Sequence, residues 1–276
     1  LLMKIKKLQN LLKKEEISML FLSSGDKNID YLTQNKSSHS FLVIEQNFAR
    51  FYITKLDNIT SKGDYKVKLI PSMWKKEFYS EGIVKIAINK QAITLSFYNE
   101  LKKIYPKAEF IDFSTNLSEL RQSKKIKEID LIRNSCKLAD DALKLFVKSF
   151  KKENFQTEIS ISLFLEQFVR TNGGNLSFPI IVANKENSAI PHHITSNKRL
   201  ESGFLLIDFG VEKEGYCSDM TRMFYIGTPS EDELNNFRLL LLAQEKAIRV
   251  VNLAEKFSNI DNIVRIVSKV TSAYIV

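Results

Sequence analysis

The chain has 276 residues, of which 44% are hydrophobic and 26% are charged, so its composition is that of a globular protein long enough for two modest domains. Lys and Arg number 41 against 32 acidic residues, giving a formal net charge of +9. The lysines are scattered through every segment, and no basic cluster accompanies a readout motif. This pattern argues against disorder and predicts no nucleic-acid partner.

The two cysteines, Cys136 and Cys217, lie far apart and lack metal-ligand spacing, which disfavours a disulfide framework and fits a reducing compartment. The opening sequence LLMKIKKLQNLLKK alternates apolar and basic residues and has no continuous apolar stretch of the kind that secretory signals contain. No apolar run reaches the ~20 residues that span a bilayer. We therefore expect a cytoplasmic protein that has no membrane partner.

The first part of the chain alternates short apolar runs with helical patterns, which is typical of a self-contained α/β domain. Helices are expected at residues 3–14 and 94–104, and a turn at 23–27. Strands are expected at residues 17–22, 41–44, 48–53, 67–70, 84–88 and 109–113.

Around residues 114–121 the composition turns polar, and a long helical pattern begins at Ser123. We therefore predict a domain boundary between residues 120 and 121, giving domains 1–120 and 121–276. A second helix is expected from Thr157 to Asn172, and a strand at 178–182. Residues 184–197 are expected to form a long loop that holds Pro191, His192 and His193.

The stretch from Phe204 to Gly227, FLLIDFGVEKEGYCSDMTRMFYIG, is typical of an antiparallel hairpin with Gly215 in its turn. With Lys213 and Glu214 as the loop residues, Asp208 faces Asp219. Facing carboxylates destabilise a sheet unless a divalent cation compensates, so we predict that this pair binds metal. Two alternatives remain open: an exposed hairpin carrying two isolated acids, or a one-residue slip that separates them.

The helix after the hairpin is expected to begin with a capping box formed by Ser230 and Glu233, and to run to about Lys256.

Several motifs, in this order, resemble those of the pita-bread metallopeptidases, which include aminopeptidase P and prolidase. They are LRQSKKIKEIDLIRNSCKLAD (120–140), TEISI (157–161), FPIIVANKENSAIPHH (178–193) and LLIDFGVEKEGYCSDMTRMF (205–224). The first third, including NIDYLT (28–33), looks like the creatinase-type N-terminal domain. The resemblance implies an α/β (α+β) fold in which this domain precedes an incomplete pita-bread domain.

By the same resemblance, Asp208 and Asp219 match two metal ligands of a site that holds two divalent ions, of Mn, Co or Zn. His192 matches a catalytic, non-ligand histidine that contacts the substrate near the scissile carbonyl. The implied activity is metal-dependent hydrolysis of the Xaa-Pro bond in dipeptides or at the N-terminus of proline-containing peptides. A homodimer is implied as well.

The family pattern also requires a histidine in an HGxG stretch and two later glutamates, which this sequence does not match. The last histidine is His193, and the later glutamates at 231, 233, 245 and 255 fall in a predicted helix. We therefore expect a C-terminally truncated chain that is inactive by itself. The alternatives are a non-catalytic pita-bread binding protein and a creatinase-like hydrolase that needs no metal.

Overall fold

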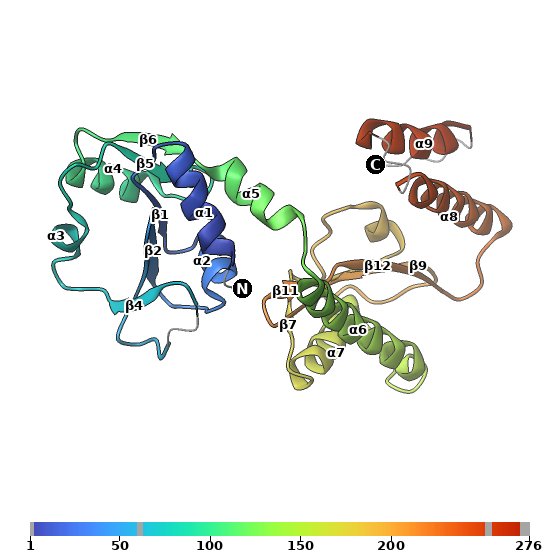
Figure 1. Ribbon diagram of the computed structural model, residues 1–276. Helices are drawn as coiled ribbons and strands as arrows, with labels where there is room; N and C mark the ends of the chain where they lie inside the picture. The colour runs from blue at the N-terminus through green and yellow to red at the C-terminus, as the bar shows by residue number, and fades with distance from the viewer. Residues whose placement is uncertain (1–2, 60–62, 252–255, 271–276) are drawn as a thin grey trace. The chain divides into compact units, whose positions relative to one another are not determined.

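The computed structural model describes residues 3–59, 63–251 and 256–270. The chain forms two compact units, Leu1–Ile129 and Asp130–Val276 (Figure 1). The boundary predicted between residues 120 and 121 falls within helix α5 (Ser114–Gln122), and it stays a prediction. Within the described ranges, no helix is both long and apolar enough to cross a membrane.

The first unit is built on a mixed six-stranded sheet with the strand order β4-β3-β2-β1-β5-β6. Its strands are β1 (Met19–Ser23), β2 (Ser40–Glu45), β3 (Ala49–Ile53), β4 (Lys66–Leu69), β5 (Lys85–Ile88) and β6 (Glu109–Asp112). Its helices are α1 (Met3–Lys14), α2 (Lys27–Thr33), α3 (Trp74–Phe78), α4 (Leu95–Ile104) and α5. Strands β1, β5 and β6 run parallel, and β2 is antiparallel to both β1 and β3.

Helices cover both faces of this sheet, which explains why every residue of β1 is buried. Leu20 packs in a cluster that contains Leu8 of α1, whereas the next residue, Phe21, packs in another that contains Phe78 of α3 and Leu101 of α4. Figure 1 shows α1 and α2 on one side of the sheet and α3 and α4 on the other. The α/β domain predicted for this part of the chain is confirmed.

The second unit begins with two helices, followed by two small antiparallel sheets of order β12-β9-β8 and β11-β10-β7. The helices are α6 (Ile126–Ser149), α7 (Glu158–Thr171), α8 (Glu231–Val251) and α9 (Phe257–Val270), with a short 3-10 helix, η1 (Lys185–Ala189). The strands are β7 (Asn175–Leu176), β8 (Ile181–Asn184), β9 (Gly203–Phe209), β10 (Val211–Lys213), β11 (Tyr216–Cys217) and β12 (Met220–Ile226).

Strand β9 alternates between a fully covered face and a half-buried face. Leu205, Ile207 and Phe209 point to the covered face, where they pack with Phe146 of α6 and Leu165 of α7. Asp208 lies on the other, more open face.

Residues 114–121 and 178–182 differ from the sequence prediction. Residues 114–121 form most of α5 because Leu117 is buried in the core of the first unit. The strand predicted at 178–182 begins instead at Ile181, because Pro179 has no backbone N–H to give to a sheet.

The predicted capping box at the start of α8 is confirmed, since Ser230 N donates to Glu233 Oε2 at 2.8 Å and Glu233 N donates to Ser230 Oγ at 3.3 Å. The structure describes α8 as far as Val251. The stretch 252–255, which leads to its predicted end near Lys256, lies outside the described residues.

Candidate active site

The turn of the hairpin is formed by Glu214 and Gly215, whose φ angles are +52° and +81°. Positive φ at both central residues is what a two-residue type I′ turn requires, and it places Lys213 opposite Tyr216. The predicted loop of Lys213 and Glu214 is wrong, because it would have left Gly215 outside the turn centre. Every pair in the hairpin is shifted by two residues as a result.

The shifted register changes the relation between the two candidate metal ligands. Asp208 pairs with Thr221, and Asp219 precedes Met220, which pairs with Phe209. The predicted direct opposition of Asp208 and Asp219 is therefore wrong. The two acids are still near neighbours, because the charge of Asp219 raises the pKa of Asp208.

Gly210 allows the two strands to approach each other between the acids. A Cβ atom at this position would lie 2.1 Å from the backbone oxygen of Ser218 and 2.9 Å from the ring of Phe178. The strands are joined there by Ser218 N, which donates to Val211 O at 2.8 Å, and by Val211 N, which donates to Ser218 Oγ at 3.0 Å. This close contact fixes the backbone on which Asp219 stands.

The carboxylate of Asp208 is in an unfavourable setting. Burial raises its pKa above the ordinary value, a hydrogen bond with Thr221 lowers it, and the charge of Asp219 raises it further. Its Oδ1 atom is buried and has no hydrogen-bond partner among the described residues. An unpaired buried carboxylate oxygen is costly, and a bound cation would remove that cost.

The two carboxylates fit one part of a divalent-metal site, because Mn²⁺, Co²⁺ and Zn²⁺ all accept carboxylate oxygens. In the described ranges, no group of three or more His, Cys, Asp and Glu side chains is arranged to hold a metal ion. These residues therefore supply two candidate ligands. The assignment of Asp208 and Asp219 as ligands stays a prediction.

The structure distinguishes the two neighbouring histidines. The side chain of His192 is exposed, and no hydrogen bond or ion pair joins it to another described residue. The side chain of His193 is only 11% exposed, and its Nε2 atom lies 2.9 Å from Oε2 of Glu158. The assignment of His192 as a catalytic histidine that contacts the substrate stays a prediction.

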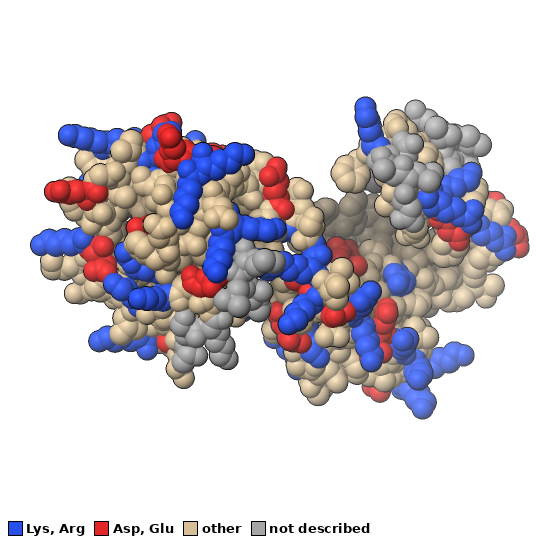
Figure 2. Space-filling model, viewed as in Figure 1, with Lys and Arg blue, Asp and Glu red and all other residues tan. Residues whose placement is uncertain are grey.

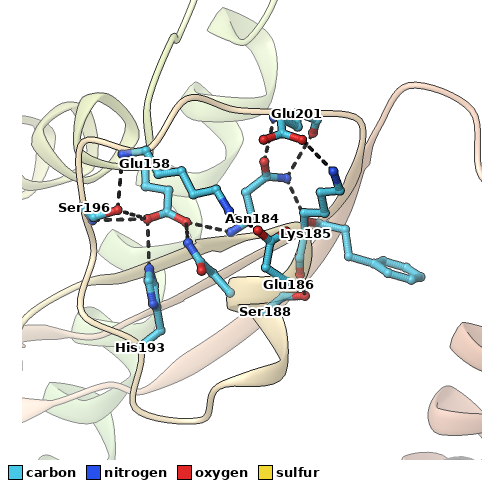
Figure 3. A network of polar contacts seen from close by, with 11 residues as sticks. Glu158, Asn184, Lys185, Glu186, Ser188, His193, Ser196 and Glu201 are labelled. Carbon is cyan, nitrogen blue, oxygen red and sulfur yellow. Dashed lines mark hydrogen bonds and ion pairs between the residues drawn. The ribbon is translucent and has the colours of Figure 1, made fainter.

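Glu158, in the first turn of α7, was given no role by the sequence analysis. It is fully buried and accepts hydrogen bonds from Asn184, Asn187, His193 and Ser196 (Figure 3). Burial alone would raise its pKa, but these hydrogen bonds outweigh burial and lower the pKa. The only sequence signal was an acid directly after the helix-capping residue Thr157.

An apolar cavity of about 180 Å³ also lies on the open face of the β9–β12 ladder. Phe204, Met223 and Tyr225 of the ladder line it together with Leu234 and Phe237 of α8. It offers space for an apolar side chain at the end of the ladder away from Asp208.

Charged side chains do not form a basic stripe on the surface in view. Figure 2 shows Lys and Arg interspersed with Asp and Glu over both units. The absence of a nucleic-acid partner stays a prediction.

Comparisons with known proteins cover nearly all of this chain. Residues 130–273 match metallopeptidase family M24, and residues 4–123 match the creatinase/prolidase N-terminal domain. An Xaa-Pro dipeptidase of Pyrococcus horikoshii is 27% identical over 267 residues, which are 95% of this chain and 75% of that protein. An uncharacterized peptidase of Bacillus subtilis, YqhT, is 30% identical over 88% of this chain and 70% of its own length.

Solved structures agree with these matches. The prolidase of Pyrococcus horikoshii superposes with a TM-score of 0.83 and 25% identity, over 96% of this chain and 77% of that one. The X-Pro aminopeptidase of Thermotoga maritima has the same fold, with a TM-score of 0.80 and 24% identity over 93% of this chain and 76% of its own. The chain belongs to metallopeptidase family M24, a family of hydrolases, and joins a creatinase/prolidase N-terminal domain to a pita-bread domain.

Proposed function

We propose that this chain serves metal-dependent hydrolysis of the bond before proline, in Xaa-Pro dipeptides or at the N-terminus of longer peptides. The observation that carries the proposal is the proximity of Asp208, in β9, to Asp219, just before β12, together with a buried oxygen of Asp208 that has no partner among the described residues. The relative named Xaa-Pro dipeptidase supports the choice of substrate.

In this proposal Asp208 and Asp219 hold the divalent cation. A cation bound there would polarise the scissile carbonyl and lower the pKa of a bound water. His192, on its exposed loop, donates a proton to the developing oxyanion or to the leaving nitrogen, a role that an imidazole can perform.

We further propose that residues 1–276 alone hold metal weakly and have no appreciable Xaa-Pro peptidase activity. Two carboxylates leave most of a coordination shell to water. The proposal also includes two metal ions, of Mn, Co or Zn, as the resemblance implies.

An activity assay with leucyl-proline and a Leu-Pro-started tripeptide tests the proposal, in Mn²⁺, Co²⁺ or Zn²⁺ and in EDTA. We expect at most trace turnover, which requires metal, is lost in Asp208→Asn and Asp219→Asn, and persists in the turn variant Glu214→Gln. Turnover in EDTA would instead indicate a creatinase-like, metal-independent reaction that uses His192.

A second candidate is a non-catalytic peptide-binding protein. It is favoured by the small number of metal-ligating side chains that the described residues bring together. Calorimetric binding of leucyl-proline without hydrolysis at any metal concentration would support it.

The homodimer and the cytoplasmic location stay predictions. Sedimentation of the purified chain measures its oligomeric state.

A further inference from the structure

Glu158 uses both of its carboxylate oxygens in the network of Figure 3. Oε1 accepts from Asn184 N at 3.0 Å and from Asn187 Nδ2 at 2.8 Å. Oε2 accepts from His193 Nε2 at 2.9 Å, Ser196 N at 3.1 Å and Ser196 Oγ at 2.9 Å. One buried carboxylate is thus bonded to donors near both ends of the segment 184–196.

Other contacts hold the ends of this segment without Glu158. Asn184 Nδ2 donates to Phe204 O at 2.9 Å, which fixes the first end against β9. Thr195 Oγ1 donates to Ile180 O at 2.9 Å and accepts from Val182 N at 2.8 Å, which fixes the other end against β8. Between these ends, Glu158 contacts Asn187 and His193.

The exposed part of the segment contains a turn that carries His192. His193 N donates to Ile190 O at 3.1 Å, so Pro191 and His192 are the two central residues of the turn. The backbone N–H of His193 closes this turn, and the ring of the same residue contacts Glu158. Because the lowered pKa of Glu158 keeps the carboxylate ionised at neutral pH, it can only accept, and His193 must carry its proton on Nε2.

We infer that Glu158 and His193 are positioning residues that set the direction of the His192 side chain. Glu158 holds the His193 ring, and the turn from Ile190 to His193 passes that constraint to His192. Neither residue is assigned a contact with substrate. The catalytic benefit of orienting His192 rests on the proposed function. The effect of Glu158 and His193 on the orientation of His192 can be measured without turnover.

The chain has three histidines, which makes the test specific. Long-range ¹H–¹⁵N correlation spectra of the imidazole rings report the tautomer of each one, and His39→Asn and His193→Asn assign the signals. In the unmodified full chain we expect His193 as the Nε2–H tautomer. An unprotonated Nε2 on His193 at neutral pH would overturn the inference.

Two variants of His193 test whether its hydrogen bond to Glu158, and not only the packing of its ring, positions His192. His193→Gln keeps an N–H that can reach Glu158, whereas His193→Phe cannot donate. We expect His193→Phe to shift the ring signals of His192 and His193→Gln to leave them near their original positions, with His39 in the first unit unchanged in both. Unshifted His192 signals in His193→Phe would overturn the inference.

Glu158→Gln is the complementary variant. Its amide nitrogen would replace one of the two oxygens and would face N–H donors from which it cannot accept a hydrogen bond. If it folds, we expect the fixed tautomer of His193 to be lost and the His192 signals to shift. If it does not fold, the comparison of His193→Gln with His193→Phe still tests the inference. In a preparation that hydrolyses leucyl-proline, His193→Phe should lower kcat about tenfold or more with little change in KM, and His193→Gln should restore it.

Absence of hydrolysis by every variant would count against the proposed function and leave the spectroscopic result standing. Conversely, unchanged His192 signals beside metal-dependent hydrolysis would overturn the positioning role alone.

Discussion

Asp208 stands opposite Thr221 in the β9–β12 ladder, and Asp219 directly precedes Met220, the first residue of β12. The two acids are thereby close enough for the charge of Asp219 to raise the pKa of Asp208, without being a direct cross-strand pair. Space for a cation between two carboxylates requires this kind of separation. Without a cation, Oδ1 of Asp208 is buried and has no hydrogen-bond partner among the described residues, which is unfavourable.

Asp208→Asn should stabilise the metal-free chain. A raised pKa means that the folded state binds the proton more tightly, so the stability contributed by protonated Asp208 is present at low pH and is lost as pH rises through the folded pKa. Removing the charge should therefore raise the free energy of unfolding at pH 7 in EDTA, by about 1 kcal/mol. Urea unfolding measures it, with Glu214→Gln as a control, and a less stable Asp208→Asn would contradict the account.

Gly210→Ala should destabilise the second unit more than Gly215→Ala does. The new Cβ at position 210 meets the Ser218 oxygen and the Phe178 ring, so we expect a loss of about 3 kcal/mol. At Gly215 no atom lies within 4 Å, and only the positive φ of +81° is unfavourable, at about 1 kcal/mol. Equal losses for the two variants in urea unfolding would show that the strands can separate at Gly210 without cost.

The stability of the second unit should depend on pH through Glu158. Its pKa is lowered in the folded state, so its contribution is present above the unfolded pKa and is lost as pH falls through the folded pKa. Thermal melts from pH 7 to pH 3 should show a steeper fall for the unmodified chain than for Glu158→Gln. Glu166→Gln, which removes an exposed pair with Arg170 on the same helix, should retain the steep fall.

The domain boundary can be tested with two fragments. Lys4 and Glu128 form a buried ion pair at 3.0 Å, and Lys4 Nζ also lies 3.4 Å from the centre of the Tyr31 ring. A fragment of residues 1–129 keeps this pair, whereas 1–120 leaves the Lys4 ammonium without its carboxylate. We expect the longer fragment to unfold at higher urea, by up to about 3 kcal/mol.

A matched change in the longer fragment, Glu128→Gln, isolates the ion pair from the other contacts of residues 121–129. If 1–120 were as stable as 1–129, the boundary predicted from composition would be the better one.

Local patterns predicted much of the fold. Residues 3–14 formed the expected helix because their apolar residues recur at helical spacing, and Leu8 and Leu12 are buried. Helix α2 was missed because it has only seven residues and depends on the side chain of Asp26, which accepts from Asn28 N. So short a helix leaves little periodicity in the sequence.

The site was less predictable, because its geometry depends on contacts between distant residues. The hairpin itself was clear, yet its register depended on which residues adopt positive φ, and Glu214 was the unexpected one. The burial of Glu158 depends on donors that follow it by 26 to 38 residues, from Asn184 to Ser196. No local pattern distinguishes such an acid from an exposed residue in the first turn of a helix.

Binding of Mn²⁺, followed by the loss of the free-ion electron paramagnetic resonance signal, tests the central claim most directly. The account predicts weak, saturable binding by the unmodified chain, lost in Asp208→Asn and in Asp219→Asn and unchanged in Glu214→Gln. Binding that is equally strong in Asp208→Asn and Asp219→Asn would contradict the claim that this carboxylate pair holds the metal.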